Sequence, residues 1–334
     1  MADERDILVV LHTQRDDTVE AAVRVCAALR DANARPVLAQ SDLDDMGEQT
    51  ALLDGIAVLG RDSELVDIEL AIVLGGDGTI LRAAELVRGG KAPILGINMG
   101  HVGFLAEIER DELDDAVRRV IERDYVVEER LALSVQVTDA TGAPLYETWA
   151  LNEATVEKAS RERMLEVVVE IDGRPLTSFG CDGVVVSSPT GSTAYNFSAG
   201  GPVVWPEVEA IAVVPLSAHA LFAKPLVVSP SAVVAIEVLP RTNGIGVLWC
   251  DGRRSHDLPP GARVVAQRST DPVRLARLHP APFTDRLVRK FQLPVYGWRG
   301  PHGGPSTGSG NATGSGNATG SGNATGSGNA TGSG

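Results

Sequence analysis

Cysteine is scarce in this chain of 334 residues, and the three cysteines, Cys26, Cys181 and Cys250, stand far apart. No Cys-x-x-Cys pair occurs. An odd number of widely spaced cysteines argues against both a disulfide framework and a zinc site. We therefore expect three buried, reduced thiols in a cytoplasmic protein.

Long hydrophobic runs and an excess of basic residues are also missing. The longest apolar stretch, residues 210–223, is interrupted by Pro215 and His219 and is too short to span a bilayer. The charged N-terminus has no apolar region of the kind found in signal peptides. With 44 acidic residues against 30 basic ones, the net charge is -14. That balance disfavours nucleic acid and anionic membranes, so we expect a partner of neither kind.

Two familiar phosphate-binding loops are absent. The pattern G-x-x-x-x-G-K-[ST] occurs nowhere, and G-x-G-x-x-G fails because Leu81 stands where the third glycine belongs. The chain has instead Gly75-Gly76-Asp77-Gly78-Thr79, between an apolar run at 72–74 and an amphipathic pattern at 80–87. This arrangement predicts a strand, a glycine turn and a helix. The backbone N–H groups of such a turn suit a phosphate.

Asp77 is the informative residue of this turn, since a carboxylate in an anion cradle repels phosphate unless it has a role. It could be a general base, or it could act through a cation that bridges it to the phosphates. Alternatively, Asp77 only caps the following helix or tightens the turn. The turn therefore predicts a nucleotide or phosphate site and leaves the role of its carboxylate open.

The sequence divides into two domains, a short segment and a tail. Residues 1–124 alternate strands with helices, which predicts a Rossmann-like α/β domain with a doubly wound parallel sheet. Residues 125–282 consist of short β-branched runs between Gly, Pro and Asp-Gly turns, which predicts a β-rich, sandwich-like domain. The segment 283–302 contains a helix, residues 283–291, that we expect to return to the first domain.

Two polar segments of the second domain are candidates for ligand binding. Asn152 and Glu153 could offer an amide and a carboxylate to the two hydroxyls of a ribose, or they could form an exposed polar turn. Residues 189–202 combine hydroxyl side chains with glycines directly after a strand. There Tyr195 could stack on a base, and a simple turn with a helix cap is the alternative.

Taken together, these motifs resemble the bacterial NAD kinase family over residues 6–295. Lipid and sphingoid kinases share the Gly-Gly-Asp-Gly turn, but they do not combine it with the later motifs. In chain order the motifs are Gly75-Gly76-Asp77-Gly78-Thr79, Gly96-Ile97-Asn98, Gly103-Phe104-Leu105, Asn152-Glu153, Asp182-Gly183, Ser188-Pro189-Thr190-Gly191-Ser192-Thr193-Ala194-Tyr195 and Ser198-Ala199-Gly200-Gly201-Pro202.

The resemblance implies transfer of the γ-phosphoryl group of ATP, or in some members of polyphosphate, to the 2′-hydroxyl of the adenosine ribose of NAD. NAD would bind between the two domains, with Asp77 as general base and with Gly78 and Arg82 beside the phosphates. The residues implied to bind the dinucleotide are Asn152, Glu153, Arg163, Asp182, Thr193, Ala194, Tyr195, Asn196, Phe197 and Ser198.

The resemblance also implies a cytoplasmic homodimer or homotetramer that depends on Mg²⁺ without a dedicated protein cage for the metal. Many members have Gln where Arg253 stands, so we expect no ligand contact there. Two other interpretations stay open. One is a non-catalytic dinucleotide sensor in which Asp77 only caps the turn, and the other is a lipid-type kinase. The failed G-x-G-x-x-G disfavours an NAD-dependent oxidoreductase.

Residues 303–334 consist almost entirely of Gly, Ser, Thr, Asn and Ala, with Gly-Ser-Gly-Asn-Ala-Thr repeated four times, and are expected to be disordered. Truncation after His302 should therefore change neither the melting temperature nor the activity, because this tail has no apolar residue large enough to dock. A drop of several degrees in the thermal melt of the truncated chain would show that the tail packs on the body.

Overall fold

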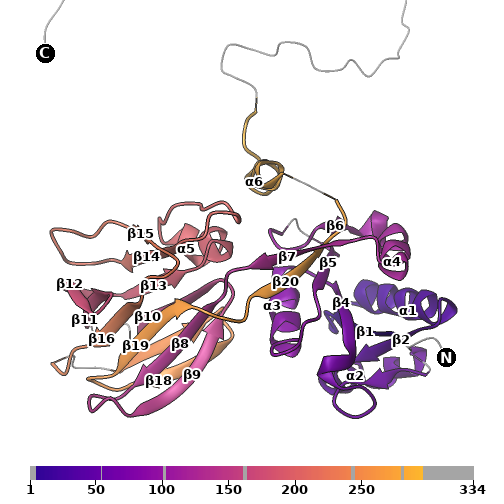
Figure 1. Cartoon of the computed structure of the whole chain (residues 1–334), viewed down its shortest axis with the longest axis horizontal. Coiled ribbons are helices and arrows are strands. Elements are labelled where there is room, and N and C mark those ends of the chain that lie inside the picture. The colour runs from indigo at the N-terminus through magenta and orange to yellow at the C-terminus, as the bar shows by residue number, and fades with distance from the viewer. Residues whose placement is uncertain are drawn as a thin grey trace, which may run out of the picture. The chain divides into compact units, whose positions relative to one another are not determined.

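A computed structural model describes residues 5–53, 55–100, 103–160, 164–241, 245–279 and 282–295. The expected disorder of the tail lies outside these ranges. The first part of the chain builds an eight-stranded sheet in the order β3-β2-β1-β4-β5-β20-β7, with β6 paired to β5 (Figure 1). Its strands are β1 (Arg5–Leu11), β2 (Ala34–Leu38), β3 (Ala57–Val58), β4 (Ile68–Leu74), β5 (Ile94–Asn98), β6 (Ile108–Glu109), β7 (Val126–Arg130) and β20 (Val273–Arg277).

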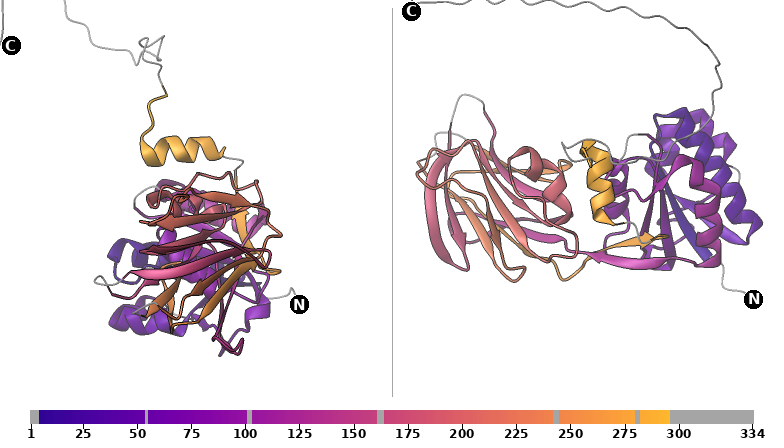
Figure 2. Two further views of the ribbon diagram at one scale, coloured as in Figure 1. Left: turned by 90° about the vertical axis from the view of Figure 1, so that its left-hand side faces the viewer. Right: turned by 90° about the horizontal axis from the view of Figure 1, so that it is seen from above.

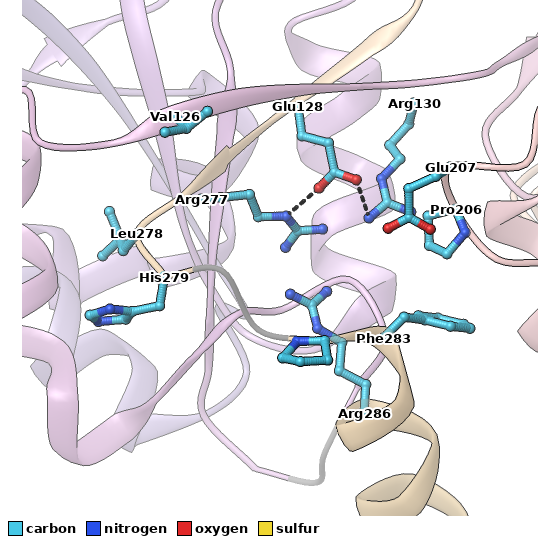
Figure 3. A pocket seen from close by; sticks show the side chains of 11 residues that line it. Val126, Glu128, Arg130, Pro206, Glu207, Arg277, Leu278, His279, Phe283 and Arg286 are labelled. Carbon is cyan, nitrogen blue, oxygen red and sulfur yellow. Dashed lines mark hydrogen bonds and ion pairs between the residues drawn. The ribbon is translucent and has the colours of Figure 1, made fainter.

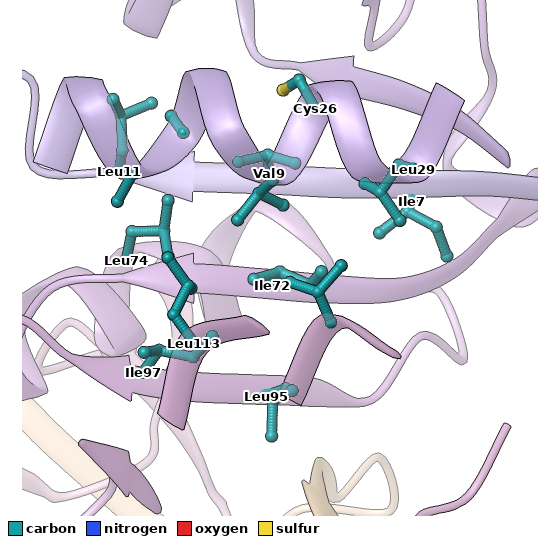
Figure 4. Packing of buried hydrophobic residues seen from close by; sticks show 14 of the residues in the cluster. Ile7, Val9, Leu11, Cys26, Leu29, Ile72, Leu74, Leu95, Ile97 and Leu113 are labelled. Atoms are coloured by element: carbon teal, nitrogen blue, oxygen red, sulfur yellow. The ribbon is translucent and has the colours of Figure 1, made fainter. Parts of the chain in front are cut away.

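Helices cover both faces of this sheet. Helices α1 (Asp16–Asp31) and α4 (Leu113–Glu122) pack on one face, and α3 (Asp77–Leu86) packs on the other. Figure 4 shows Leu29 of α1 beside Ile7 of β1, and Cys26 of the same helix belongs to the same buried cluster. The central strands are nearly continuous apolar runs because neither face meets water. Apart from the antiparallel pair β7–β20, the strands run parallel, which confirms the predicted Rossmann-like, doubly wound α/β sheet.

Two six-stranded antiparallel sheets form the other part of the structure, and their inner faces share one hydrophobic core (Figure 2). This confirms the predicted sandwich. The sheet β15-β14-β13-β10-β17-β18 consists of β10 (Glu153–Lys158), β13 (Gly183–Ser187), β14 (Ile211–Leu216), β15 (Leu226–Val228), β17 (Gly246–Cys250) and β18 (Arg254–Leu258). The sheet β12-β11-β16-β19-β8-β9 consists of β8 (Leu133–Thr138), β9 (Pro144–Ala150), β11 (Leu165–Ile171), β12 (Arg174–Cys181), β16 (Val234–Val238) and β19 (Arg263–Arg268).

The strands that join the two parts differ from the sequence interpretation. By sequence, β7 and β20 both belong to the second domain, residues 125–282. In the structure β20 pairs with β5, where Leu275 lies beside Ile94, and β7 pairs with β20. Periodicity in a sequence reports which residues are buried but not which sheet a strand joins. The chain therefore returns to the first sheet after it has completed the sandwich.

Helix α6 (Phe283–Phe291) has the bounds expected from the sequence. The rings of Phe283 and Phe291 lie 6.2 and 5.6 Å, centroid to centroid, from the ring of Phe104 in the loop after β5. Phe291 also stacks on Phe197 at 4.5 Å. The helix thus contacts both parts of the structure rather than the first domain alone. Within the described ranges, no helix is long and apolar enough to cross a membrane.

Candidate active site

The glycine turn lies at the carboxyl end of β4 and leads directly into α3, as the sequence predicted. The carbonyl oxygen of Gly76 accepts hydrogen bonds from the N–H groups of Thr79 (2.9 Å) and Ile80 (3.1 Å), which begin the helix. Asp77 and Gly78 occupy the first turn, where backbone N–H groups have no partner within the helix. Since Gly78 is exposed and Asp77 half-exposed, the turn offers a helix N-terminus to a phosphate.

The Asp77 carboxylate holds a distant loop instead of capping its own helix. Its Oδ1 accepts hydrogen bonds from the N–H groups of Phe104 (3.1 Å) and Leu105 (3.0 Å), and its Oδ2 accepts one from Phe104 (3.0 Å). A Cβ atom on Gly103 would lie 2.3 Å from Oδ1, so this loop approaches the carboxylate only because residue 103 is glycine. The carboxylate is therefore fixed in place at the start of α3.

A cavity of about 390 Å³ opens beside the turn. It lies where the loops after β1 and β4 meet, beyond the carboxyl ends of two neighbouring parallel strands. The sequence pattern did not single out the loop after β1, because the strand order that places it here cannot be read from periodicity. The residues that line the cavity are Leu11, His12, Thr13, Gln14, Asp45, Gly76, Gly78, Thr79, Arg82 and Arg253.

Two arginines reach this cavity. Arg82 pairs with Asp42, a fully buried residue of α2 (Gln40–Met46), and donates to the carbonyl oxygen of Leu11 at 2.7 Å. Arg253, in the turn between β17 and β18, pairs with Glu85 of α3 at 3.1 Å. The expectation that Arg253 makes no ligand contact stays a prediction, but its side chain lies in the cavity wall.

Asn152 lies between β9 and β10, and Glu153 is the first residue of β10. The two residues are only 8% and 6% exposed, so the alternative of an exposed polar turn is wrong. The Asp251 carboxylate holds the main chain here by accepting hydrogen bonds from the N–H groups of Leu151 (2.9 Å) and Asn152 (2.7 Å). Glu153 Oε2 accepts the N–H of Tyr195 at 3.3 Å. Burial, together with the nearby Asp251 carboxylate, raises the pKa of Glu153 to about 8, so this carboxyl group carries a proton at neutral pH.

Arg254 ties this turn to α3. Its guanidinium pairs with Asp251 at 2.7 Å and with Glu85 of α3 at 3.0 Å, and it lies over the ring of Trp149, 4.6 Å from the centroid. The helix that begins at the glycine turn is thus connected to the Asn152–Glu153 turn by a continuous chain of ion pairs and hydrogen bonds. The sequence indicated only a turn at 251–252, and nothing in the pattern pointed to this connection.

The polar segment after β13 forms a 3-10 turn, Thr190–Thr193, and a single helical turn, α5 (Tyr195–Ser198). It packs closely on the neighbouring turn, because a Cβ atom on Gly191 would lie 2.0 Å from the carbonyl oxygen of Asn152. The predicted ligand residues of this segment that reach the surface at least in part are Thr193, Ala194, Tyr195, Phe197 and Ser198.

Asn196 differs from its neighbours in being fully buried. Its Nδ2 donates to the carbonyl oxygens of Ser192 (3.3 Å) and Pro202 (3.1 Å), and its Oδ1 has no hydrogen-bond partner among the residues that the structure describes. The side chain therefore braces the segment from within, and its contact with a dinucleotide stays a prediction. Arg163, another predicted contact, lies outside the described residues.

Asp182 lies at the opposite end of β10 from Glu153. It pairs with Lys158, which lowers the pKa of Asp182. At ~3.3 Å per residue, the two ends of β10 are about 16 Å apart. Burial and neighbouring carboxylates, among them Glu153 and Asp182, raise the pKa of Tyr195. Glu153 and Asp182 thus lie at opposite ends of one strand rather than at one point.

In the part of the chain that the structure describes, no group of three or more His, Cys, Asp or Glu side chains could hold a metal ion. A divalent cation that arrives with a nucleotide needs fewer ligands, since Mg²⁺ is usually held by one or two carboxylates and by substrate phosphates. Asp45 in the cavity wall, whose Oδ2 accepts the hydroxyl of Thr13 at 3.3 Å, fits this chemistry.

Comparison with known sequences matches both parts of the chain. Residues 7–125 match the family described as ATP-NAD kinase N-terminal domain, and residues 151–278 match the ATP-NAD kinase C-terminal domain. The NAD kinase of Leifsonia xyli subsp. xyli is 63% identical over 303 residues, which cover 91% of this chain and 99% of the relative. The NAD kinase of Thermobifida fusca is 58% identical over 301 residues, which cover 89% and 92%.

Solved structures agree with this match. An NAD kinase from Archaeoglobus fulgidus in complex with ATP has a TM-score of 0.66 at 25% identity, covering 86% of this chain and 98% of that one. A yeast NADH kinase complexed with NADH has a TM-score of 0.78 at 22% identity, covering 88% and 89%, and this second likeness concerns the fold alone.

Glu153→Gln is expected to make stability less sensitive to pH. The folded-state pKa of Glu153, about 8, lies above the usual 4.5, so the folded state holds the proton more tightly than the unfolded state. Stability of the parent should therefore fall as pH rises from about 5 to 8 and level off above that. The variant has no such proton and should melt above the parent at about pH 8 and close to it at about pH 5. Thermal melts that stay parallel across this range would contradict a protonated Glu153.

Proposed function

Because the chain belongs to the NAD kinase family, we propose that it transfers the γ-phosphoryl group of ATP to the 2′-hydroxyl of the adenosine ribose of NAD, which yields NADP. It is a phosphotransferase, and the sensor and lipid-kinase interpretations gain no support from the family matches. One observation carries the proposed site. Asp77 stands at the helix N-terminus that borders the 390 Å³ cavity, and the same helix is tied to the Asn152–Glu153 turn.

In the proposed reaction the Asp77 carboxylate accepts the proton of the attacking hydroxyl. Oδ1 already receives two N–H groups, whereas Oδ2 receives one, so Oδ2 has a lone pair for the substrate. The ribose oxygen forms its bond to the γ-phosphorus as the bond from that phosphorus to the bridging oxygen of ADP breaks. The loop amides hold the carboxylate in position before the substrate arrives.

Positive groups around the cavity would neutralise the phosphates. Arg82 lines it together with the N-terminus of α3, and phosphoryl transfer depends chiefly on positioning and on charge stabilisation. The ion pair with Asp42 orients Arg82 in advance, which reduces the entropy lost on binding. Mg²⁺, held by the ATP phosphates and by Asp45, would supply further positive charge to the phosphoryl oxygens.

The dinucleotide would lie along β10. Asn152 and Glu153 would hold ribose hydroxyls, and the proton on Glu153 lets that carboxyl group donate as well as accept a hydrogen bond. Residues 193–198 and Asp182 would continue the site toward the other end of the strand, and Arg163 would complete it.

We place the enzyme in the cytoplasm as a homodimer or homotetramer, and we propose polyphosphate as a second phosphoryl donor. The cysteines support a reducing compartment. Cys26, Cys181 and Cys250 are free and buried, and burial raises the pKa of each thiol to about 12, so none has the character of a reactive thiolate.

A product assay tests the reaction. Purified protein with ATP, Mg²⁺ and NAD should generate NADP, detected by a strictly NADP-dependent dehydrogenase. EDTA should abolish the signal, because the chain has no P-loop lysine that could neutralise the ATP phosphates once Mg²⁺ is removed. If the protein binds NAD but forms no NADP from ATP, other nucleoside triphosphates or polyphosphate, the kinase interpretation is wrong. The protein would then be a dinucleotide sensor.

Asp77→Asn should lose kcat by about 10²–10⁴-fold, the usual contribution of a positioned general base, while NAD affinity is retained. Both quantities are measured on one preparation. Asp114→Asn is the matched control, because it changes an exposed aspartate in the first turn of α4 and should leave kcat unchanged. A kcat for Asp77→Asn within about tenfold of the parent would mean that the carboxylate only holds the loop.

A further inference from the structure

A second cavity, of about 510 Å³, borders the loop that Asp77 holds (Figure 3). Phe104 and Leu105 donate their N–H groups to Asp77, and their carbonyl oxygens accept hydrogen bonds from two arginines in the wall of this cavity. Arg286 of α6 donates to Phe104 at 3.2 Å, and Arg277 of β20 donates to Leu105 at 3.3 Å. The peptide unit between Phe104 and Leu105 therefore connects this cavity with the candidate general base, because its carbonyl oxygen accepts from Arg286 and its N–H donates to Asp77.

Three guanidinium groups from three elements converge in the cavity: Arg130 of β7, Arg277 of β20 and Arg286 of α6. The Glu128 carboxylate lies between two of them, 2.7 Å from Arg277 Nε and 2.8 Å from Arg130 Nη2. Figure 3 shows that the guanidinium of Arg286 faces that of Arg277 across the cavity. Arg286 has no ion pair with a carboxylate in the described ranges, so its guanidinium can pair with an anion.

Two carboxylates already pair with Arg277, whereas neither forms an ion pair with Arg286. Glu128 Oε2 lies 2.7 Å from Arg277 Nε, and Glu107 Oε2 lies 3.3 Å from Arg277 Nη1. Glu207 lines the cavity but is exposed to solvent. Within the described ranges, Arg286 forms no ion pair with a carboxylate. Burial and the charge of Arg277 lower the pKa of Arg286 to about 10, so it stays charged at neutral pH.

Two buried donor atoms in this wall have no partner. Arg277 Nη2 and Arg130 Nε make no hydrogen bond with any residue that the structure describes. The side chains of these arginines are only 10% and 7% exposed. Buried N–H groups without a partner are rare and indicate a missing water or ion. Together with Arg286, three arginines of this wall thus have N–H groups that no residue in the described ranges accepts.

The rest of the wall is apolar and indicates a ligand larger than a bare ion. Val126, Pro206, Leu278 and Phe283 line the cavity beside the arginines. Phe283 is held by the edge of Trp205, with the ring centroids 5.3 Å apart. A cavity of this volume with an apolar wall and a few convergent polar groups has the usual character of a small-molecule site.

We propose that this cavity binds a small organic phosphate monoester, with the phosphate against Arg130, Arg277 and Arg286 and the organic body against Phe283 and its apolar neighbours. Three arginines approaching from different sides match the three terminal oxygens of a phosphate better than the two of a carboxylate. The ligand would hold Arg277 and Arg286 against the loop that positions Asp77. Binding here is separate from the proposed phosphoryl transfer and does not depend on it.

Calorimetric titration of the full chain with phenyl phosphate tests the proposal. We expect binding that is weaker with inorganic phosphate, which lacks the aromatic body, and absent with phenol, which lacks the charge. Arg286→Gln should weaken phenyl phosphate binding about 10–100-fold, because it removes a charge-assisted contact while the amide can still donate to Phe104. Arg286→Lys, which keeps the charge without the planar fork, should lose less.

Two control variants locate the site. Arg289→Gln makes the same change at an exposed position of α6 and should bind like the parent. Arg253→Gln alters the other cavity and should also bind like the parent. Full affinity in Arg286→Gln, or loss in Arg253→Gln instead, would overturn the proposal. Equal affinity for inorganic phosphate and phenyl phosphate would contradict the claim that the ligand has an organic body. If neither compound binds, the proposal is wrong, and the unpartnered N–H groups of the arginines bind water instead.

Amide hydrogen exchange tests the connection to the loop. Phenyl phosphate should slow exchange at Phe104 and Leu105 in the parent, because the anion removes the repulsion between Arg277 and Arg286 and keeps both on the loop carbonyls. Arg286→Gln should show little slowing at the same ligand concentration. Exchange that is unchanged in the ligand-saturated parent would overturn the connection.

Discussion

The chain of contacts from Glu85 through Arg254 to Asp251 fixes the geometry on which the candidate active site depends. It joins two separately packed hydrophobic cores, since α3 packs on the first sheet and Asp251 belongs to the sandwich. Asp251 is only 7% exposed, so removing its partner would leave a buried charge at a cost of about 3–5 kcal/mol. The carboxyl group of Glu153 and the glycine turn hold their relative positions because this network is complete.

The loop of residues 103–105 also fixes the candidate active site, because it holds the Asp77 carboxylate. Its N–H groups face the carboxylate and its carbonyl oxygens face arginines, so one short stretch of main chain forms a wall shared by two chemically different sites. A chain with net charge -14 attracts few anions over its surface as a whole. We therefore expect phosphate recognition only where the fold brings arginines together, around Arg82 and around Arg277.

Much of this could be predicted from local pattern. The strand, turn and helix around Asp77 follow from neighbouring residues alone, and so do the helix of residues 283–291 and several of the sandwich strands. What the sequence could not reveal depends on contacts between distant residues. Asp251 looks like an ordinary Asp-Gly turn until Leu151 and Asn152 are seen to donate to it. Asn196 stands in a polar motif, yet its side chain is turned inward by Ser192 and Pro202. The family resemblance implied which residues act in the site, whereas only the structure showed which hydrogen bonds hold them in place.

Strand β20 belongs to the first sheet but comes near the end of the sequence, which affects how the chain folds during synthesis. During synthesis β5 emerges long before β20, and until the sandwich has been translated the start of β5, at Ile94, has no neighbour on that side. An apolar strand with unpaired backbone groups can pair with another chain, and such long-range pairing also slows folding. In the interval between the two strands this edge is therefore open to pairing with another chain. A fragment that ends at residue 124 would keep that edge open, because the strand that covers it follows the second part in the sequence.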